Sequence, residues 1–161
     1  MADMKDQNAG AQYPFYIHDQ YIKDLSFENP NFLIKYSENQ TQPQVSVNVE
    51  TGVAKLANNN YEASMTITTK SKIGEEAIFV LELVYASLVS VSPDLQQEVL
   101  ESILLVHCPF LMFPFAREIV ANVTKSGGYP PLLIEPVDFA SLYLEKKKET
   151  SATVERKILQ T

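Results

Sequence analysis

Hydrophobic and polar residues alternate along the first half of the chain, which is typical of β-strands with one buried face. The first such stretch is residues 15–28. Its apolar positions, which an ideal strand would place on one face, are Phe15, Ile17, Tyr21, Leu25 and Phe27. Asp19 and Lys23 fall on that same face. We therefore expect a β-bulge, an edge position or a partner chain near the start of this strand.

Three more strands are predicted before residue 92. Residues 45–50 and 61–72 alternate in the same way, and the Gly and Asn residues between them suit tight connections. The run 75–91 is apolar at both parities, so it is predicted to be a central strand or one covered on both faces. Short turns between these segments favour an antiparallel sheet in meander order.

The second half of the chain predicts helices broken by prolines. Ser92 is a plausible N-cap, with Pro93 at the first helical position. Pro109 lacks a backbone donor and is expected to interrupt this helix, which Pro114 would restart, giving one kinked rod or two short helices. The pair Gly127-Gly128 should end it.

An extended arm follows, because Pro130, Pro131 and Pro136 exclude a regular helix or a central strand. Asp138 can cap a last helix. The sequence thus predicts an α+β fold: a four-stranded antiparallel sheet, a long kinked helix, a proline-rich crossover arm and a C-terminal helix.

Chain length and composition predict one domain with short tails. Residues 1–12 and 148–161 are predicted to be disordered tails that flank a folded domain at 13–147. The N-terminus has no apolar segment typical of a secretory signal. No uncharged apolar run reaches about 18 residues, so no membrane span is expected.

Charge and cysteine content narrow the function further. The net charge is −7, and the residues before Glu145 carry 8 basic against 17 acidic side chains. Such an acidic surface argues against nucleic acid as a partner, because binding to phosphates needs a concentration of Lys and Arg. A single cysteine, Cys108, cannot form an internal disulfide and fits the reducing cytoplasm.

The sequence offers little support for catalysis, and we expect no catalytic residues, metal or cofactor. His107 and Cys108 are adjacent, and neighbouring helical residues point about 100° apart, so they cannot form a nucleophile and base pair. One Cys and two distant His residues do not predict a zinc site. Gly127-Gly128 ends a helix instead of beginning one, which argues against a phosphate-binding loop.

One long motif resembles a known family. Residues 108–143 read CPFLMFPFAREIVANVTKSGGYPPLLIEPVDFASLY. The order Cys-Pro, Phe-Pro-x-Ala-Arg-Glu, proline-spaced apolar arm and Pro-Val-x-Phe resembles the signature of the SecB export chaperones. Residues 21–30, YIKDLSFENP, are similar to the first strand of that family, and Gly74-Glu75-Glu76 to its third turn. The resemblance covers residues 15–144.

The resemblance implies a function without nucleotide, metal or enzymatic activity. A SecB protein is a cytoplasmic holdase that keeps precursor proteins unfolded and delivers them to the SecA motor for export through the Sec translocase. It works as a homotetramer, a dimer of dimers. Here the surplus of apolar residues between 92 and 126, together with the family pattern, predicts Val99 and Ile103 at the oligomer interface.

The family pattern also implies two binding sites. The client-binding groove would be lined by Tyr129, Leu132, Leu133, Ile134, Phe139, Leu142 and Tyr143. SecA would bind at Asp24 and Glu28, which lie on the polar face of the first strand, and at Ile73 and Glu75. Without the resemblance, most of the groove residues would be interpreted as core. That leaves an alternative function: a non-enzymatic α+β interaction or small-ligand module with a closed core.

Overall fold

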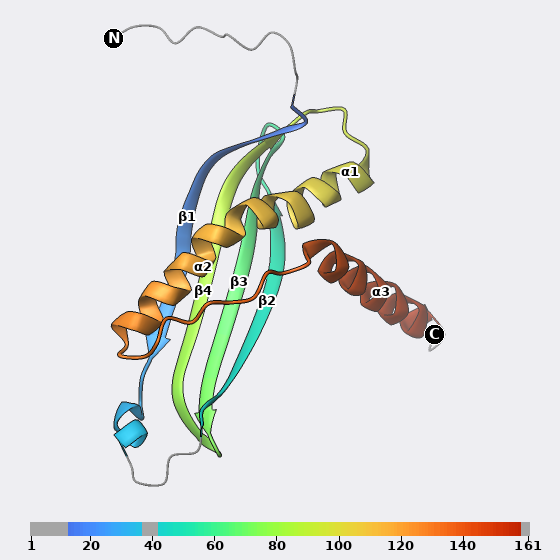
Figure 1. The fold of residues 1–161 in the computed structure, drawn as a ribbon. Coiled ribbons are helices and arrows are strands. Elements are labelled where there is room, and N and C mark those ends of the chain that lie inside the picture. Colours follow the sequence, from blue (N-terminus) through green and yellow to red (C-terminus); the bar gives the residue numbers. More distant parts are fainter. Residues whose placement is uncertain (1–12, 37–41, 159–161) are drawn as a thin grey trace, which may run out of the picture.

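Four antiparallel strands form one sheet in the order β1-β4-β3-β2 (Figure 1). The structure is a computed structural model that describes residues 13–36 and 42–158. The strands are β1 (Phe15–Glu28), β2 (Gln44–Lys55), β3 (Asn60–Ile73) and β4 (Glu76–Val91). The prediction of a four-stranded antiparallel sheet is confirmed.

The predicted meander holds only for the last three strands. β2, β3 and β4 follow one another as hairpins, whereas β1 pairs with β4 at the opposite edge of the sheet. The connection after β1, which contains the short helix η1 (Phe32–Tyr36), is long enough to carry the chain across to the far edge. β4 is therefore central, as its continuous apolar run predicts.

Two bulges decide which β1 side chains face the core. The pairing with β4 shifts between Ile17 and Asp19 and again between Ile22 and Asp24, so both the predicted bulge and the predicted edge position are present. The first shift reverses the alternation and the second restores it. Tyr21 consequently lies on the face away from the helices, which corrects its predicted place on the apolar face.

One helical rod lies across the other face of the sheet, here called the helix face (Figure 1). The rod consists of α1 (Gln97–Ser102), the π-helical turn η2 (Ile103–His107) and α2 (Cys108–Ser126). It begins later than predicted, because the backbone amide of Ser92 still donates to the carbonyl of Pro14 at the start of the sheet.

Neither proline divides the rod into two helices. The amide of Cys108 donates to the carbonyl of Ile103, five residues earlier, so a wider π turn precedes Pro109. Pro109 then falls in the first turn of α2, where a missing donor costs little, and Pro114 lies inside the helix. The predicted break is thus a local change of helical pitch.

Residues 129–138 form the arm, which has no regular secondary structure and runs back over the helix face toward β2 (Figure 1). Asp138 then caps α3 (Phe139–Ile158) as predicted, with its Oδ1 accepting from the amide of Ser141 at 3.0 Å. α3 continues well past residue 148, which corrects the predicted start of a disordered C-terminal tail. Residues 145–158 contain neither Pro nor Gly and are rich in Lys and Glu, which favour helix. The predicted tail at 1–12 lies outside the described residues.

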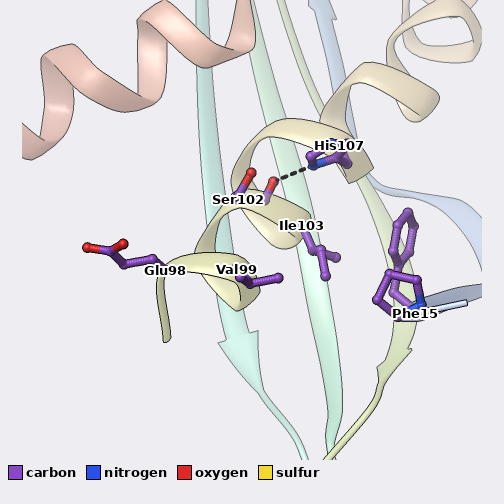
Figure 2. A pocket seen from close by; sticks show the side chains of 7 residues that line it. Phe15, Glu98, Val99, Ser102, Ile103 and His107 are labelled. Carbon is purple, nitrogen blue, oxygen red and sulfur yellow. Dashed lines mark hydrogen bonds between the residues drawn. The ribbon is translucent and has the colours of Figure 1, made fainter. Parts of the chain in front are cut away.

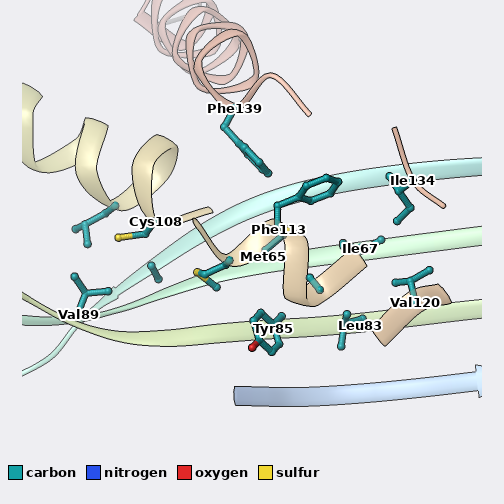
Figure 3. Packing of buried hydrophobic residues seen from close by; sticks show 14 of the residues in the cluster. Met65, Ile67, Leu83, Tyr85, Val89, Cys108, Phe113, Val120, Ile134 and Phe139 are labelled. Atoms are coloured by element: carbon teal, nitrogen blue, oxygen red, sulfur yellow. The ribbon is translucent and has the colours of Figure 1, made fainter. Parts of the chain in front are cut away.

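The core lies between the sheet and the rod, with the arm closing one side (Figure 3). β3 and β4 contribute their inward positions, among them Met65, Ile67, Leu83 and Val89. The rod contributes Cys108, Met112, Phe113, Ala116 and Val120, and the arm and α3 add Ile134 and Phe139. Phe113 and Phe139 meet edge to face, with ring centroids 5.8 Å apart.

By length and composition alone, Gln97–Ser126 is apolar enough to cross a membrane, although no membrane span was predicted. A single helix of this kind is weak evidence, because core helices pass the same criterion. The composition has a structural reason here, since one side of the rod is buried against β3 and β4.

Candidate functional site

The predicted groove residues divide into a buried set and an accessible set. Ile134 is 5% exposed and Phe139 is 3% exposed, and both belong to the core cluster. They fill the space under the arm and beside Phe113, so at these two positions the interpretation as core holds. Leu133 is 62% exposed and presents the arm's main accessible apolar surface.

Leu132, Leu142, Tyr143 and Tyr129 are half-buried. Leu132 and Leu142 pack against the core with part of their surface and leave the rest accessible. Tyr129 packs at the root of the arm, with its ring centroid 4.9 Å from that of Phe79. This contact joins the root of the arm to β4.

Tyr143 lines a hollow between α3, the rod and β2. The hollow has a volume of about 460 Å³, and its lining includes Thr51, Gly52 and Val53 from β2, Leu105 from the rod, and Lys146 and Lys147 from α3. Apolar and polar groups mix in this lining, so an inserted side chain could meet both kinds of contact.

Three exposed valines of β2 extend this apolar surface, and the sequence analysis did not assign them to the groove. Val45, Val47 and Val53 are 46%, 40% and 41% exposed. Their register with β3 places them on the helix face, opposite Ser71, Thr69 and Ala63, all of which are buried. The alternation of this strand predicted their common face, but their exposure follows from the edge position of β2, which comes from the topology.

Polar contacts join α3 to the rod at one side of the hollow. Tyr143 Oη donates to Glu101 Oε2 at 2.5 Å, and Lys147 Nζ lies 3.2 Å from Tyr143 Oη. The hydrogen bond from Tyr143 lowers the pKa of Glu101, and Gln97 adds to this effect. The hydrogen bond with Tyr143 raises the pKa of Lys147. Both groups therefore keep their charges over the neutral range.

The four predicted SecA-binding residues lie at one edge and one end of the sheet. Asp24 and Glu28 are exposed and pair with Val84 and Val80, which places both carboxylates on the outer face, away from the helices. Their common face agrees with the sequence analysis. Glu75 is exposed and Ile73 is half-buried at the β3–β4 turn, beyond the end of β4 that pairs with Glu28.

The outer face carries a second polar cluster nearer the centre of β1. Tyr21 donates to Glu62 of β3, and Lys23 forms an ion pair with the same carboxylate. The hydrogen bond to Glu62 raises the pKa of Tyr21 to about 12. The hydrogen bond from Lys23 is the main cause that lowers the pKa of Glu62, so this carboxylate stays ionised and is paired with the Lys23 ammonium group.

The predicted oligomer residues line a separate, mostly apolar hollow of about 340 Å³ (Figure 2). Val99 is 43% exposed, whereas Ile103 is 3% exposed and forms part of the wall. Pro14 and Phe15 from the start of β1 complete the lining, together with polar groups of the rod such as His107. The outward side of the rod continues this apolar surface with Phe110, Leu111 and Phe115, which are 67%, 45% and 51% exposed.

Nothing in this arrangement suggests a catalytic centre or a metal site within the described residues. Cys108 is fully buried, and burial raises the pKa of its thiol to about 12, so it is a core residue and not a nucleophile. His107 is exposed and its Nδ1 lies 3.0 Å from the carbonyl of Ser102. The described part of the chain contains no group of three His, Cys, Asp or Glu side chains that could hold a metal ion.

Comparison with known proteins places the chain in a family. The model of the family described as Preprotein translocase subunit SecB matches residues 8–150. The chain belongs to the SecB family. The SecB resemblance of the motif at residues 108–143 is thereby confirmed, and so are the α+β fold and the identity of the chain as a member of the protein-export chaperones.

Individual relatives cover most of the chain. A Protein-export protein SecB from a Bradyrhizobium species is 44% identical over 133 residues, which is 83% of this chain and 82% of that protein. The SecB of Mesorhizobium japonicum is 36% identical over 151 residues, or 94% of this chain and 90% of its own length.

A solved structure has the same fold at low sequence identity. It is the Mycobacterium tuberculosis SecB-like chaperone Rv1957, in complex with a ChAD peptide from the Rv1956 HigA1 antitoxin. The TM-score is 0.64 at 15% identity, covering 77% of this chain and 91% of that one. This likeness shows that the SecB fold persists when most residues differ.

Proposed function

We propose that this SecB family member is an ATP-independent holdase that binds unfolded precursor proteins in the cytoplasm and delivers them to SecA. The observation that carries the proposal is the accessible apolar surface beside the arm, on a chain of the protein-export chaperone family. Holding a client unfolded requires binding energy and no bond chemistry, so the function needs no catalytic residue, metal or nucleotide.

The client-binding groove runs over the helix face between the arm, β2 and α3. Leu133 and the three exposed valines offer apolar contact, and the hollow beside Tyr143 offers room for a larger side chain. The free energy of binding to aliphatic side chains grows with the apolar area that is buried and depends little on the sequence of the bound segment. Ile134 and Phe139 support this surface from beneath. A SecB-like relative binds a peptide, which supports a polypeptide as the ligand.

SecA would dock on the outer face, at the opposite side of the sheet from the client. Asp24 and Glu28 present two exposed carboxylates there, and Ile73 and Glu75 add an apolar and an acidic contact at the turn. A basic segment of SecA is the complementary partner, and its charge would also speed association. Separation of the two sites by the sheet allows client and motor to bind together.

The working assembly is proposed to be a homotetramer, a dimer of dimers. The hollow around Val99 and Ile103 and the exposed aromatic residues of the rod form an apolar surface that a second copy can cover. Four copies would carry four grooves, and a long client that occupies several of them gains avidity from individually weak contacts.

Three measurements test the proposal against an interaction or small-ligand module with a closed core. The folded protein should bind the dye ANS, and it should delay the refolding of a slow-folding client without ATP when tetramer is present in excess. Light scattering on the eluting protein should give the tetramer mass. A folded monomer that neither binds ANS nor delays refolding would support the closed-core module instead.

A further inference from the structure

The arm is attached to the rest of the molecule by very few backbone hydrogen bonds. Pro130, Pro131 and Pro136 have no amide hydrogen. Between these prolines, in the described structure, the amide of Leu132 is the one that donates to another element. Besides the side-chain packing of Leu132, Ile134 and Val137, the Leu132 amide is therefore the backbone attachment of this part of the arm.

The acceptor is the hydroxyl of Thr124 in the last part of α2. Leu132 N lies 2.9 Å from Thr124 Oγ1, and Thr124 is fully buried. The same hydroxyl lies 2.9 Å from the carbonyl oxygen of Val120 and 3.1 Å from that of Ala121, so its proton points back along the helix and a lone pair faces the arm. The carbonyl of Thr124 also accepts the amide of Tyr129 at 3.1 Å. One residue thus holds both ends of the turn from α2 into the arm.

The end of β1 holds the same turn from the other side. Asn29 Nδ2 donates to the carbonyl of Gly127 at 3.1 Å, and Tyr129 Oη donates to Asn29 Oδ1 at 2.5 Å. A Cβ atom at Gly127 would lie 2.4 Å from the ring of Phe27, so a larger residue there would have to displace this ring.

We propose that Thr124 is a positioning residue for client binding, which fixes the arm through Leu132 and is assisted by Asn29 at the root. The Thr124 hydroxyl holds the backbone of Leu132, and the next residue, Leu133, is exposed to solvent. The hydroxyl therefore fixes the position of the Leu133 side chain over the helix face. This role rests on the proposed holdase function. Without the anchor the arm would sample several positions, and each client contact would have to order it first.

The test compares Thr124→Val with Thr124→Ser. Valine fills the same volume as threonine but cannot accept a hydrogen bond, whereas serine keeps the hydroxyl. We expect T124V to speed hydrogen exchange of the Leu132 amide and to weaken binding of a short fluorescent apolar peptide by about three- to tenfold. In T124S, the exchange rate of the Leu132 amide and the peptide affinity should both stay close to those of the wild type. The tetramer mass and the affinity for a SecA tail peptide should not change in either variant.

The outcomes separate this role from a general loss of stability and from a failure of the proposed function. Faster Leu132 exchange in T124V with unchanged peptide affinity would overturn the positioning role. Equal weakening in T124S and T124V would also overturn it, because the hydroxyl would then be irrelevant. Wild-type protein that fails to bind the peptide at all would refute the holdase function instead. If T124V does not fold, Tyr129→Phe decides: it removes the hydrogen bond to Asn29, and unchanged peptide affinity would count against the proposal.

Discussion

The phenolic oxygen of Tyr143 in α3 lies 2.5 Å from a carboxylate oxygen of Glu101 in the rod, 42 residues earlier in the chain. Lys147 Nζ lies 3.8 Å from the same carboxylate, and Lys146 Nζ reaches the carbonyl of Thr51 at 3.3 Å. The side of α3 that borders the hollow is thus tied to the rod and to β2 by polar contacts near solvent. Such contacts respond to pH and to salt more readily than a packed core does.

Acid is expected to loosen α3 from the rod. The pKa of Glu101 is lowered in the folded chain, so its contribution is fully present above the ordinary carboxyl pKa and is lost as pH falls through the lowered folded value. A bimane dye on Ser151→Cys, which lines the hollow, should report this transition, since Cys108 is buried and stays unlabelled. Glu101→Gln should abolish the transition. Glu98→Gln, one turn away, should keep it, and a transition that survives in E101Q would exclude Glu101 as its origin.

Replacing Leu133 by Asp should weaken client binding while sparing the fold. The side chain is 62% exposed, so the mutation removes apolar contact from the groove without opening a cavity. The expected loss is about 1–3 kcal/mol per groove, measured with a short peptide to avoid avidity. Leu33→Asp is the matched control, because Leu33 is 76% exposed and belongs to η1, which is not one of the elements that border the groove. Equal effects of the two mutations would place the client elsewhere.

A charge at Val99 should reduce the mass of the assembly. Val99 lines the apolar hollow at the start of the rod, and burying an unpaired carboxylate there against another copy is costly. Light scattering should therefore show Val99→Asp as a smaller species with unchanged helix content. Leu56→Asp is a control of nearly equal exposure, 44% against 43%. A V99D variant that remains tetrameric would remove this surface from the interface.

Reversing the charges of Asp24 and Glu28 should weaken SecA binding and flatten its salt dependence, because both carboxylates face outward where they can steer a basic partner. Calorimetric titration of a SecA tail peptide measures both quantities. A double variant with Glu50→Lys and Asp94→Lys makes the same change in net charge at other exposed sites and should bind like wild type. Client binding should survive in both. If the two double variants behave alike, only net charge matters.

The sequence correctly predicted those features of secondary structure that depend on residues close together in the chain. The alternation at the two ends of β1, the two-sided apolar run of β4, the Asp138 cap and the end of α2 at the Gly-Gly pair all have causes within a few residues. The motif at 108–143 supplied the family and, through it, the candidate sites. The outward faces of Asp24 and Glu28 followed from strand parity alone.

Long-range pairing could not be predicted in the same way. β1 pairs with β4, so β2 becomes the opposite edge strand of the sheet. The edge position of β2 leaves its three valines exposed. Ile134 and Phe139 are buried, whereas Leu133 is 62% exposed, although all three are apolar residues of the arm and the start of α3. Which of them is buried depends on where the rod places Phe113 beneath the arm. The bond between Tyr143 and Glu101 joins two helices whose relative placement no local pattern encodes.

The paired bulges of β1 also determine how this strand can change in length. His18 and Lys23 are the residues skipped in the pairing with β4. Deleting either one would leave every other β1 residue opposite its present partner and on its present face. Deleting Gln20 instead would shift the residues on one side of it by one position, which turns either Asp19 or Tyr21 to the helix face. The strand therefore contains two positions where a residue can be lost while the facing of all the others is kept.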